Sequence, residues 1–179
     1  MDYLKAVQYI PHVDLQDNII GKVERWEAHK KGILHRAFTI SIKYKDYFIL
    51  QHRKHPVFDS VYDLSISSHP LYTGDSLEDI LTAIYRTLKR EWHLDKEHLT
   101  NKPYYVGKCH YQAKDTLSEY QEHEICHIYT CEVKELSLPD FETAYGFSLY
   151  TKDQIKDATN PLFSLLAPWV HSMIKEGLL

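Results

Sequence analysis

The 179-residue sequence predicts an α+β fold in which a mixed β-sheet is packed between α-helices. Two pairs of β-rich runs occupy the first third of the chain, a strongly amphipathic helix follows, and two more β-rich runs precede two helical segments. No Gly/Ser-rich or Pro-rich linker interrupts this order. A chain of this length normally buries one core, so we expect residues 1–179 to form one domain.

The first third of the chain is predicted to form two β-hairpins. Residues 5–13 and 19–27 are extended runs joined by the polar turn DLQDN. Residues 37–44 (AFTISIKY) and 47–52 (YFILQH) are rich in β-branched and aromatic side chains. Only the dipeptide KD separates the second pair, which is typical of a tight hairpin turn.

The strongest helix pattern covers residues 76–94, SLEDILTAIYRTLKREWHL. Ser76 and Asp79 resemble a capping box at its start. An apolar side chain then recurs every four residues, at Ile80, Ile84, Leu88 and Trp92. This spacing places them on one face of the helix, which we expect to be buried.

The second half adds two strands and two helices. Residues 104–111 and 123–133 have strand-like patterns. A short helix is predicted near residues 151–158, and a last helix from Pro161, because proline suits the first turn of a helix.

Composition excludes several classes of protein. The net charge is −4 and the basic residues are scattered among acidic ones, which argues against a nucleic-acid surface. No segment approaches eighteen consecutive apolar residues, and the amino terminus lacks a basic region followed by an apolar run, so we expect neither a membrane span nor secretion. Three cysteines without C-x-x-C spacing indicate no disulfide framework, which fits a cytoplasmic protein: Cys109, Cys126 and Cys131.

A candidate metal site emerges from the stretch QEHEICH. Strand alternation places Glu122 and Glu124 on one face, with His123 on the other. Three histidines, two in EAHKKGILHRAF and one in the SHP turn, could complete the site: His29, His35 and His69. Such a mixed nitrogen and oxygen set suits Zn²⁺, Mn²⁺ or Fe²⁺ more than Mg²⁺. Spacing alone leaves open that the histidines are surface residues and the glutamates a solvated strand face.

Four segments together resemble a known family. GILHRAF, SSHPLY, YRTLKREWHL and EHEI occur in this order within a similarity that runs from about residue 5 to about residue 175. They are similar to the type 1 isopentenyl-diphosphate isomerases of the Nudix superfamily, which implies a Nudix fold. The resemblance also implies that one divalent transition metal (Zn, Mn or Fe) is held by five residues: His29, His35, His69, Glu122 and Glu124. It further implies that Glu91 binds Mg²⁺ together with the substrate diphosphate.

The resemblance implies a set of catalytic residues as well. In the family a cysteine and a glutamate flank the substrate, and these positions correspond to Ser67 and Glu124. A tyrosine that assists the acid corresponds to Tyr111, and a tryptophan whose ring face stabilises a carbocation corresponds to Trp169. Either aromatic residue could instead be an ordinary core residue. The serine is a clear departure, because an alcohol is a far weaker acid than a thiol.

The substrate implied is a small-molecule diphosphate, and basic residues are available to bind it. Four lie near positions where the family has basic residues: Arg25, Arg53, Lys54 and Arg86. Guanidinium groups suit bidentate contacts to phosphate, although surface charge is the alternative for Arg53 and Lys54. Other departures are Leu64 in place of a family asparagine and Thr87 in place of a helix arginine. The sequence does not indicate an oligomeric state.

The helix departs from the signature of Nudix hydrolases, which is Gly, five residues, Glu, seven residues, then Arg-Glu-x-x-Glu-Glu-x-Gly. Here Arg86 and Glu91 correspond to signature residues, and Ile80 stands at the position taken as the early glutamate. Hydrolysis by a multi-carboxylate metal cluster is therefore disfavoured, with Glu78 or Asp79 as the available substitutes. Three alternatives follow: an isomerase altered by Ser67, a hydrolase of another diphosphate, and a catalytically silent diphosphate-binding protein.

Overall fold

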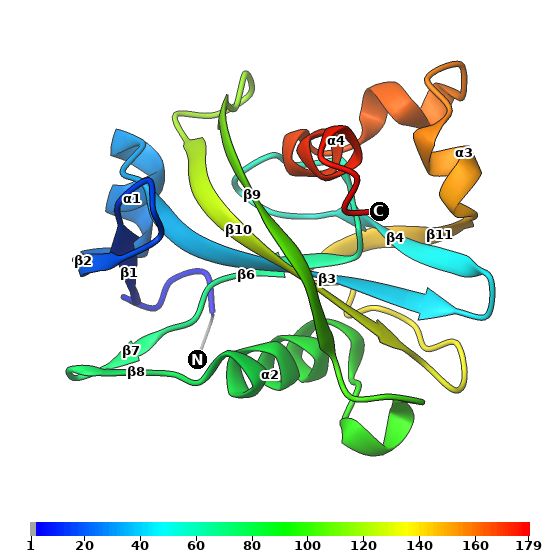
Figure 1. Ribbon diagram of the computed structural model, residues 1–179, viewed down its shortest axis with the longest axis horizontal. Coiled ribbons are helices and arrows are strands. Elements are labelled where there is room, and N and C mark those ends of the chain that lie inside the picture. Colours follow the sequence, from blue (N-terminus) through cyan, green and yellow to red (C-terminus); the bar gives the residue numbers. More distant parts are fainter. Residues whose placement is uncertain (1–2) are drawn as a thin grey trace.

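The computed structural model describes residues 3–179 and contains a nine-stranded mixed sheet with helices on both sides (Figure 1). The strands of this sheet are β1 (Tyr9–Val13), β2 (Ile19–Glu24), β3 (His35–Tyr44), β4 (Tyr47–Arg53), β5 (Tyr62–Asp63), β6 (Ile66–Ser68), β9 (Tyr104–Lys114), β10 (Gln121–Glu132) and β11 (Ala144–Tyr150). The short strands β7 (Tyr72–Thr73) and β8 (Ser76–Leu77) form a separate hairpin. The helices are α1 (Arg25–Lys31), α2 (Ile80–Trp92), α3 (Lys152–Lys156) and α4 (Pro168–Lys175), with 3₁₀ helices at Lys96–His98 and Pro161–Leu165.

Strand β3 lies at the centre of the sheet and brings distant segments together. It pairs in parallel with β10 from its first residue, with His35 beside Glu124, to Lys43 beside Glu132. On the opposite edge it pairs with β6, where Thr39 lies beside Ser67. Segments that are far apart in the sequence therefore meet across a single strand.

Two apolar layers enclose the sheet. In Figure 1, α2 lies below it, and α3 and α4 lie above it. Ile84, Leu88 and Trp92 of α2 are fully buried in the lower layer, as the four-residue repeat predicted, whereas Ile80 is only partly buried. Trp169 of α4 belongs to the upper layer.

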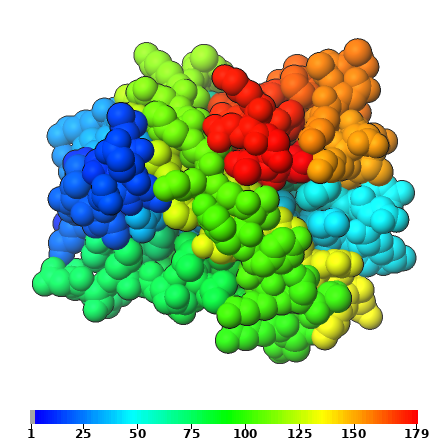
Figure 2. All heavy atoms as spheres, viewed as in Figure 1, coloured from blue at the N-terminus to red at the C-terminus, as the bar shows by residue number. Residues whose placement is uncertain are grey.

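The carboxyl-terminal segment packs directly against β9. Figure 2 shows this segment at the surface beside β9. A Cβ atom at Gly107 would lie 2.5 Å from a methyl carbon of Leu178, so only glycine allows this approach without a shift of the leucine.

The predicted α+β class and both amino-terminal hairpins are confirmed, and several details differ from the sequence-based expectations. The second extended run ends at Glu24, where α1 begins. The cap of α2 is Asp79, which accepts a hydrogen bond from the Thr82 backbone, whereas Ser76 lies in β8. Pro161 begins a 3₁₀ helix and α4 begins at Pro168. Strand β11 and the short strands β5, β6 and β7 were not predicted. The short helix near residues 151–158 is confirmed as α3.

None of the helices within residues 3–179 is long and apolar enough to cross a membrane.

Candidate metal centre and its cavity

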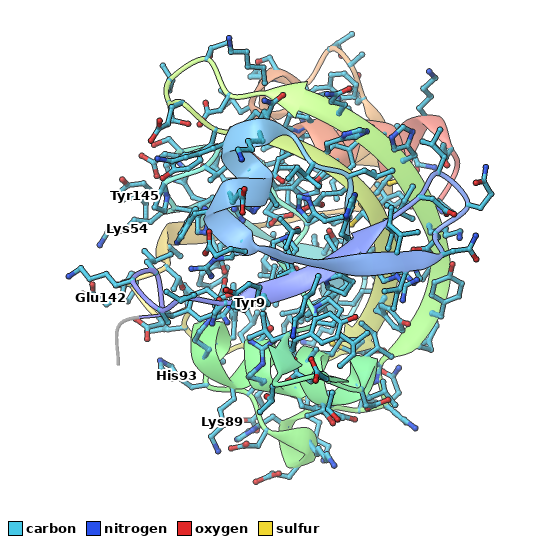
Figure 3. All side chains as sticks on the ribbon, turned by 90° about the vertical axis from the view of Figure 1, so that its left-hand side faces the viewer. Tyr9, Lys54, Lys89, His93, Glu142 and Tyr145 are labelled. Carbon is cyan, nitrogen blue, oxygen red and sulfur yellow. The ribbon has the colours of Figure 1, made fainter. Side chains whose placement is uncertain are left out.

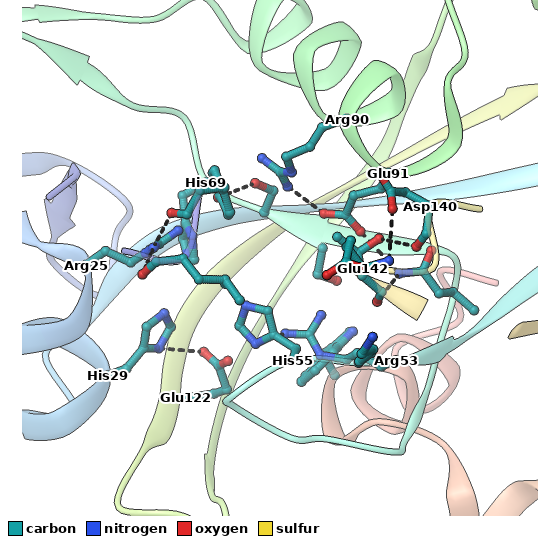
Figure 4. Close-up of a pocket in the computed structure, with 18 of the residues that line it drawn as sticks. Arg25, His29, Arg53, His55, His69, Arg90, Glu91, Glu122, Asp140 and Glu142 are labelled. Carbon is teal, nitrogen blue, oxygen red and sulfur yellow. Dashed lines mark hydrogen bonds and ion pairs between the residues drawn. The ribbon is translucent and has the colours of Figure 1, made fainter. Parts of the chain in front are cut away.

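A cavity of about 430 Å³ is lined by side chains from α1, α2, α4, β4, β6, β9 and β10 and from the loops between elements (Figure 4). It collects most of the residues that the sequence singled out: Arg25, His29, Arg53, Lys54, Ser67, His69, Glu91, Tyr111, Glu122, Glu124 and Trp169. His35 is completely buried and contacts Glu124 from behind the lining. Arg86 does not line this cavity.

The five residues expected to hold a transition metal lie together at the cavity, four of them in its lining and His35 behind it. One ligand atom from each of His29, His35 and His69 lies within 4.8 Å of the other two. The same limit holds for the ligand atoms of His35, Glu122 and Glu124. The parallel pairing of β3 with β10 places His35 beside Glu124, and alternation along β10 places Glu122 on the same face.

Burial shapes the charge states in this cluster. It lowers the pKa of His29 to about 4 and that of His69 to about 3, so both rings are neutral near neutral pH and can offer lone pairs. Burial and the neighbouring Glu124 raise the pKa of Glu122 well above its ordinary value. Burial alone would also raise the pKa of Glu124, but its contacts with His35 and His69 hold it well below the ordinary value.

The arrangement fits a divalent cation because it leaves acceptor atoms facing one another. Nδ1 of His35 lies 2.7 Å from the Ile33 carbonyl, which can only accept, so in the neutral ring Nε2 carries the lone pair. Nε2 of His35 lies 3.3 Å from Oε1 of Glu124, and Oε2 of Glu122 lies 3.2 Å from Nδ1 of His29, but among the described residues neither buried atom has a partner with hydrogen-bond geometry. A cation bound here would offset the charge of the two buried carboxylates and accept lone pairs from both of these atoms.

Glu124 connects the metal cluster with the aromatic wall of the cavity. Its Oε1 lies 3.1 Å from Nε2 of His69, and its Oε2 accepts a hydrogen bond from the Tyr111 hydroxyl. Burial, and then the nearby Glu124 charge, raise the pKa of Tyr111 well above its ordinary value, so the phenol remains a donor. The Trp169 ring lies 5.9 Å from that of Tyr111. Both aromatic residues therefore line the site as well as packing in the core.

Ser67 lies in a chain of hydrogen bonds that runs away from the cavity. Its hydroxyl donates to Oδ1 of Asp63 at 3.2 Å. Because that hydroxyl has one proton, Thr39 donates to Ser67 across their 2.8 Å contact. Thr39 in turn lies 3.3 Å from the thiol sulfur of Cys126, so the Thr39 hydroxyl bridges this cysteine and Ser67.

The two expected basic residues of the β4 region have different surroundings. Arg53 is buried, lies 3.4 Å from Asp63 through Nη1, and donates through Nη2 to Nδ1 of His55 at 3.0 Å. Lys54 is partly exposed, and its ammonium donates to the Phe141 carbonyl at 2.9 Å. Figure 3 shows Lys54 at the periphery of the molecule. Arg53 therefore organises the cavity wall, whereas Lys54 lies at its rim.

Arg86, expected to bind phosphate, lies outside the cavity lining and pairs with a carboxylate of its own region. Its guanidinium forks onto Glu78 with two 2.9 Å contacts and donates to the His69 carbonyl at 3.0 Å. Seven residues separate Glu78 from Arg86, and the hydrolase signature has the same spacing between its early glutamate and its arginine. The early glutamate position is therefore occupied by Glu78, and the assignment of Ile80 to it was wrong. The pair ties α2 to the SHP turn and thereby fixes a predicted metal ligand.

Glu91 is buried with both carboxylate oxygens engaged. Oε1 lies 2.5 Å from Nη2 of Arg90, and Oε2 accepts a hydrogen bond from the Gln51 amide at 3.1 Å. The amide oxygen of Gln51 accepts the indole N–H of Trp92 at 2.6 Å. The carboxylate predicted to bind Mg²⁺ is thus part of an internal network.

Sequence reasoning missed several residues around this cavity. Tyr3, His55 and Arg90 line it, and Asp63 lies behind Ser67, outside the lining. Asp63 had no distinguishing sequence signal, and its importance follows only from the way β5 pairs with β4. Arg90 could have been found, because it directly precedes Glu91 on the same helix. Burial lowers the pKa of His55 well below its ordinary value, so this ring is neutral.

Sequence comparison shows distant relatives of two kinds. The chain is 29% identical to the isopentenyl-diphosphate Delta-isomerase of Serratia proteamaculans over 169 residues, which cover 92% of this chain and 88% of that enzyme. It is 25% identical over 154 residues to a protein of Clostridium acetobutylicum named as an uncharacterized Nudix hydrolase, with 73% and 72% of the two chains covered. No model of a protein family matches the sequence. Such relatives suggest that this protein is an enzyme.

Structural comparison identifies the fold. DR0079 of Deinococcus radiodurans superposes with a TM-score of 0.67 at 12% identity, covering 94% of this chain and 98% of that chain. The MutT NUDIX hydrolase of Burkholderia pseudomallei superposes with a TM-score of 0.51 at 15% identity, covering 79% and 96%. The chain therefore has a Nudix fold, which confirms the fold expected from the sequence resemblance.

Proposed function

We propose that this protein is a metal-dependent isomerase of the isopentenyl-diphosphate isomerase type, which interconverts isopentenyl and dimethylallyl diphosphate. The observation that carries the proposal is the meeting of all five expected metal ligands beside Tyr111, Trp169 and Ser67 around one cavity. The isomerases among the relatives support the same reading.

One divalent transition metal, Zn²⁺, Mn²⁺ or Fe²⁺, would be held by His29, His35, His69, Glu122 and Glu124. When bound, such an ion supplies a fixed positive charge that keeps Glu124 ionised and oriented. Glu124 is then available to exchange a proton with a substrate carbon, and the Tyr111 hydroxyl, which donates to Glu124, holds that carboxylate in place.

The reaction protonates an alkene, passes through a tertiary carbocation, and removes a different proton. Ser67 on β6 and Glu124 on β10 lie on opposite edges of β3, so they can approach a bound substrate from two sides. The face of the Trp169 ring, which is 1% exposed to solvent, can stabilise the cation in a site that excludes water.

Ser67 makes this isomerisation slow in our proposal. General acid catalysis contributes about 10²–10⁴-fold, and an alcohol is poorly matched to that task near neutral pH. Ser67 also directs its proton toward Asp63 and not toward the cavity.

Hydrolysis of another diphosphate is less well supported by the surroundings of α2. It requires carboxylates that are free to bind metal, and the two available substitutes are engaged elsewhere. Glu78 is paired with Arg86, and Asp79 caps α2. Thr87 and Arg90 stand where the signature has glutamates, so Glu91 is the only glutamate left in its Arg-Glu-x-x-Glu-Glu segment.

Purified protein incubated with isopentenyl diphosphate in deuterated water tests the proposal. We expect slow formation of dimethylallyl diphosphate carrying deuterium, detected by nuclear magnetic resonance. Release of phosphate from nucleoside diphosphates without any alkene isomer would favour the hydrolase. Binding of isopentenyl diphosphate without either reaction, for wild type and Ser67→Cys alike, would favour the silent binding protein.

A further inference from the structure

The Mg²⁺ that the family resemblance implies at Glu91 does not fit the surroundings of this carboxylate. A cation would have to compete with Arg90 for Oε1 and with the Gln51 amide for Oε2. Arg90 also places a permanent positive charge against the carboxylate, with a separation of 2.5 Å. Mg²⁺ gives up its bound water reluctantly and favours unencumbered carboxylates, so it is a poor competitor here.

Arg90 itself has unused hydrogen-bonding capacity at the cavity. Its Nε and Nη1 are buried and have no hydrogen-bond partner within residues 3–179. Arg25, which is 2% exposed, has a buried Nε that lacks a partner in the same part of the chain. Both residues line the cavity, on α2 and α1 respectively. Buried guanidinium donors without partners are costly and indicate a site for an anion.

The two guanidinium groups converge on one aromatic ring. The central carbon of Arg90 lies 3.6 Å from the centroid of the Tyr3 ring, and that of Arg25 lies 4.6 Å from it. Figure 4 shows Arg25 and Arg90 near opposite sides of His69, with His29 and Glu122 lower in the view. A cation–π contact is weaker than several charge-assisted hydrogen bonds to phosphate, so a diphosphate can take the place of the ring.

We propose that Arg90, together with Arg25, binds the diphosphate group in place of Mg²⁺, so that this cavity takes up a diphosphate free of magnesium. The inference rests on the proposed function for the chemical class of the ligand. Arg90 stands at a position where the hydrolase signature has a glutamate. A positively charged side chain therefore replaces a negatively charged one that could bind a cation. A guanidinium is suited to bidentate contacts with two phosphate oxygens.

Calorimetric titration with inorganic pyrophosphate tests this assignment. The protein is loaded with its transition metal, freed of Mg²⁺, and titrated with and without added Mg²⁺. We expect wild type to bind pyrophosphate in the magnesium-free buffer and added Mg²⁺ not to strengthen binding. We expect Arg90→Gln to weaken magnesium-free binding by about 10–100-fold, because it removes charge-assisted hydrogen bonds.

Two further variants make the test specific. Lys89→Gln removes a positive charge from the adjacent position of α2, and Figure 3 shows that Lys89 points away from the molecule. It should bind pyrophosphate like wild type. Arg90→Glu restores a carboxylate and should make binding dependent on Mg²⁺. Circular dichroism establishes that each variant is folded, and Arg90→Lys, which keeps the charge, should retain part of the affinity.

Two results would overturn the inference. One is wild-type binding that requires Mg²⁺, and the other is an Arg90→Gln variant that binds as tightly as wild type in its absence. Failure of the isomerase proposal alone would give a different pair of results. The protein would then bind magnesium-free pyrophosphate through Arg90 and show no alkene isomerisation.

Discussion

Ser67 and Asp63 are joined by a hydrogen bond in which the serine hydroxyl donates to Oδ1 of the aspartate at 3.2 Å. The same oxygen accepts the indole N–H of Trp169 at 2.7 Å. One buried carboxylate thus orients both the residue at the expected acid position and the aromatic ring beside it. Burial raises the pKa of Asp63, while Arg53 and these hydrogen bonds oppose the rise.

Replacing Ser67 with cysteine should increase isomerase turnover. A thiol has an ordinary pKa of about 8.5, whereas an alcohol is not an effective acid near neutral pH. We expect kcat for Ser67→Cys to rise about 100-fold, within the range of about 10²–10⁴ for a matched acid. Conversion of isopentenyl to dimethylallyl diphosphate measures the change. Ser67→Ala is the control, and a cysteine variant no faster than this alanine variant would contradict the assignment of position 67.

Metal analysis of the purified protein should find one transition metal per chain. His69→Ala and Glu124→Gln should each lose most of it, because each removes a ligand from the buried cluster. His110→Ala is a matched control, since His110 is exposed on β9 and lies outside the cluster. Mass spectrometry of the metal content measures the result. Equal metal content in His69→Ala and His110→Ala would count against the site.

The stability of Glu122→Gln should depend on whether metal is present. Without metal, the variant removes repulsion between two buried carboxylates and should be at least as stable as wild type. With metal, it replaces a charged ligand by a neutral one and should be less stable by about 1–3 kcal/mol. Urea unfolding with metal and with chelator measures both states. A variant with the same stability relative to wild type in the two conditions would argue that Glu122 is not a ligand.

Arg86→Lys should weaken metal binding without removing a ligand. The lysine cannot fork onto Glu78 while donating to the His69 carbonyl, so the SHP turn loses an anchor. Residues that orient metal ligands typically affect affinity by about 10–100-fold, and we expect about 10-fold here. Competition with a chelator measures the affinity. Lys89→Arg serves as the control on the exposed side of α2, and an unchanged affinity for Arg86→Lys would refute the anchoring role.

Asp17 should make the protein sensitive to acid. Burial would raise its pKa, but contacts with Arg36, Lys108 and His127 outweigh burial and lower it. A lowered folded-state pKa contributes stability that is present above the unfolded value of about 3.9 and is lost as the pH falls through the folded value. Asp17→Asn should therefore reduce the free energy of unfolding by about 1–2 kcal/mol at neutral pH.

The same variant should approach wild-type stability in strong acid, where Asp17 is protonated in both folded and unfolded protein. Urea unfolding at neutral and acidic pH measures the difference. Asp46→Asn, at an exposed turn position, is the control and should change little at either pH. A stability deficit for Asp17→Asn that persists unchanged in acid would contradict the ionic role of this aspartate.

Local patterns were sufficient for most of the fold. The alternation in β10 correctly put Glu122 and Glu124 on one face, and the four-residue repeat found the buried face of α2. The start of α1 and strand β11 escaped prediction because their stability depends on packing against distant segments, which a local pattern does not contain.

The sequence by itself determined which chemical groups this protein can bring to a metal, since the imidazole and carboxylate residues stand in recognisable order along the chain. Only the tertiary structure decided which charges share a site. It turned Arg86 toward Glu78, set Arg90 against Glu91, and placed Asp63 behind Ser67. The physical reason is that charge–charge and hydrogen-bond energies depend on distances of a few ångströms, and those distances arise from the pairing of strands far apart in sequence.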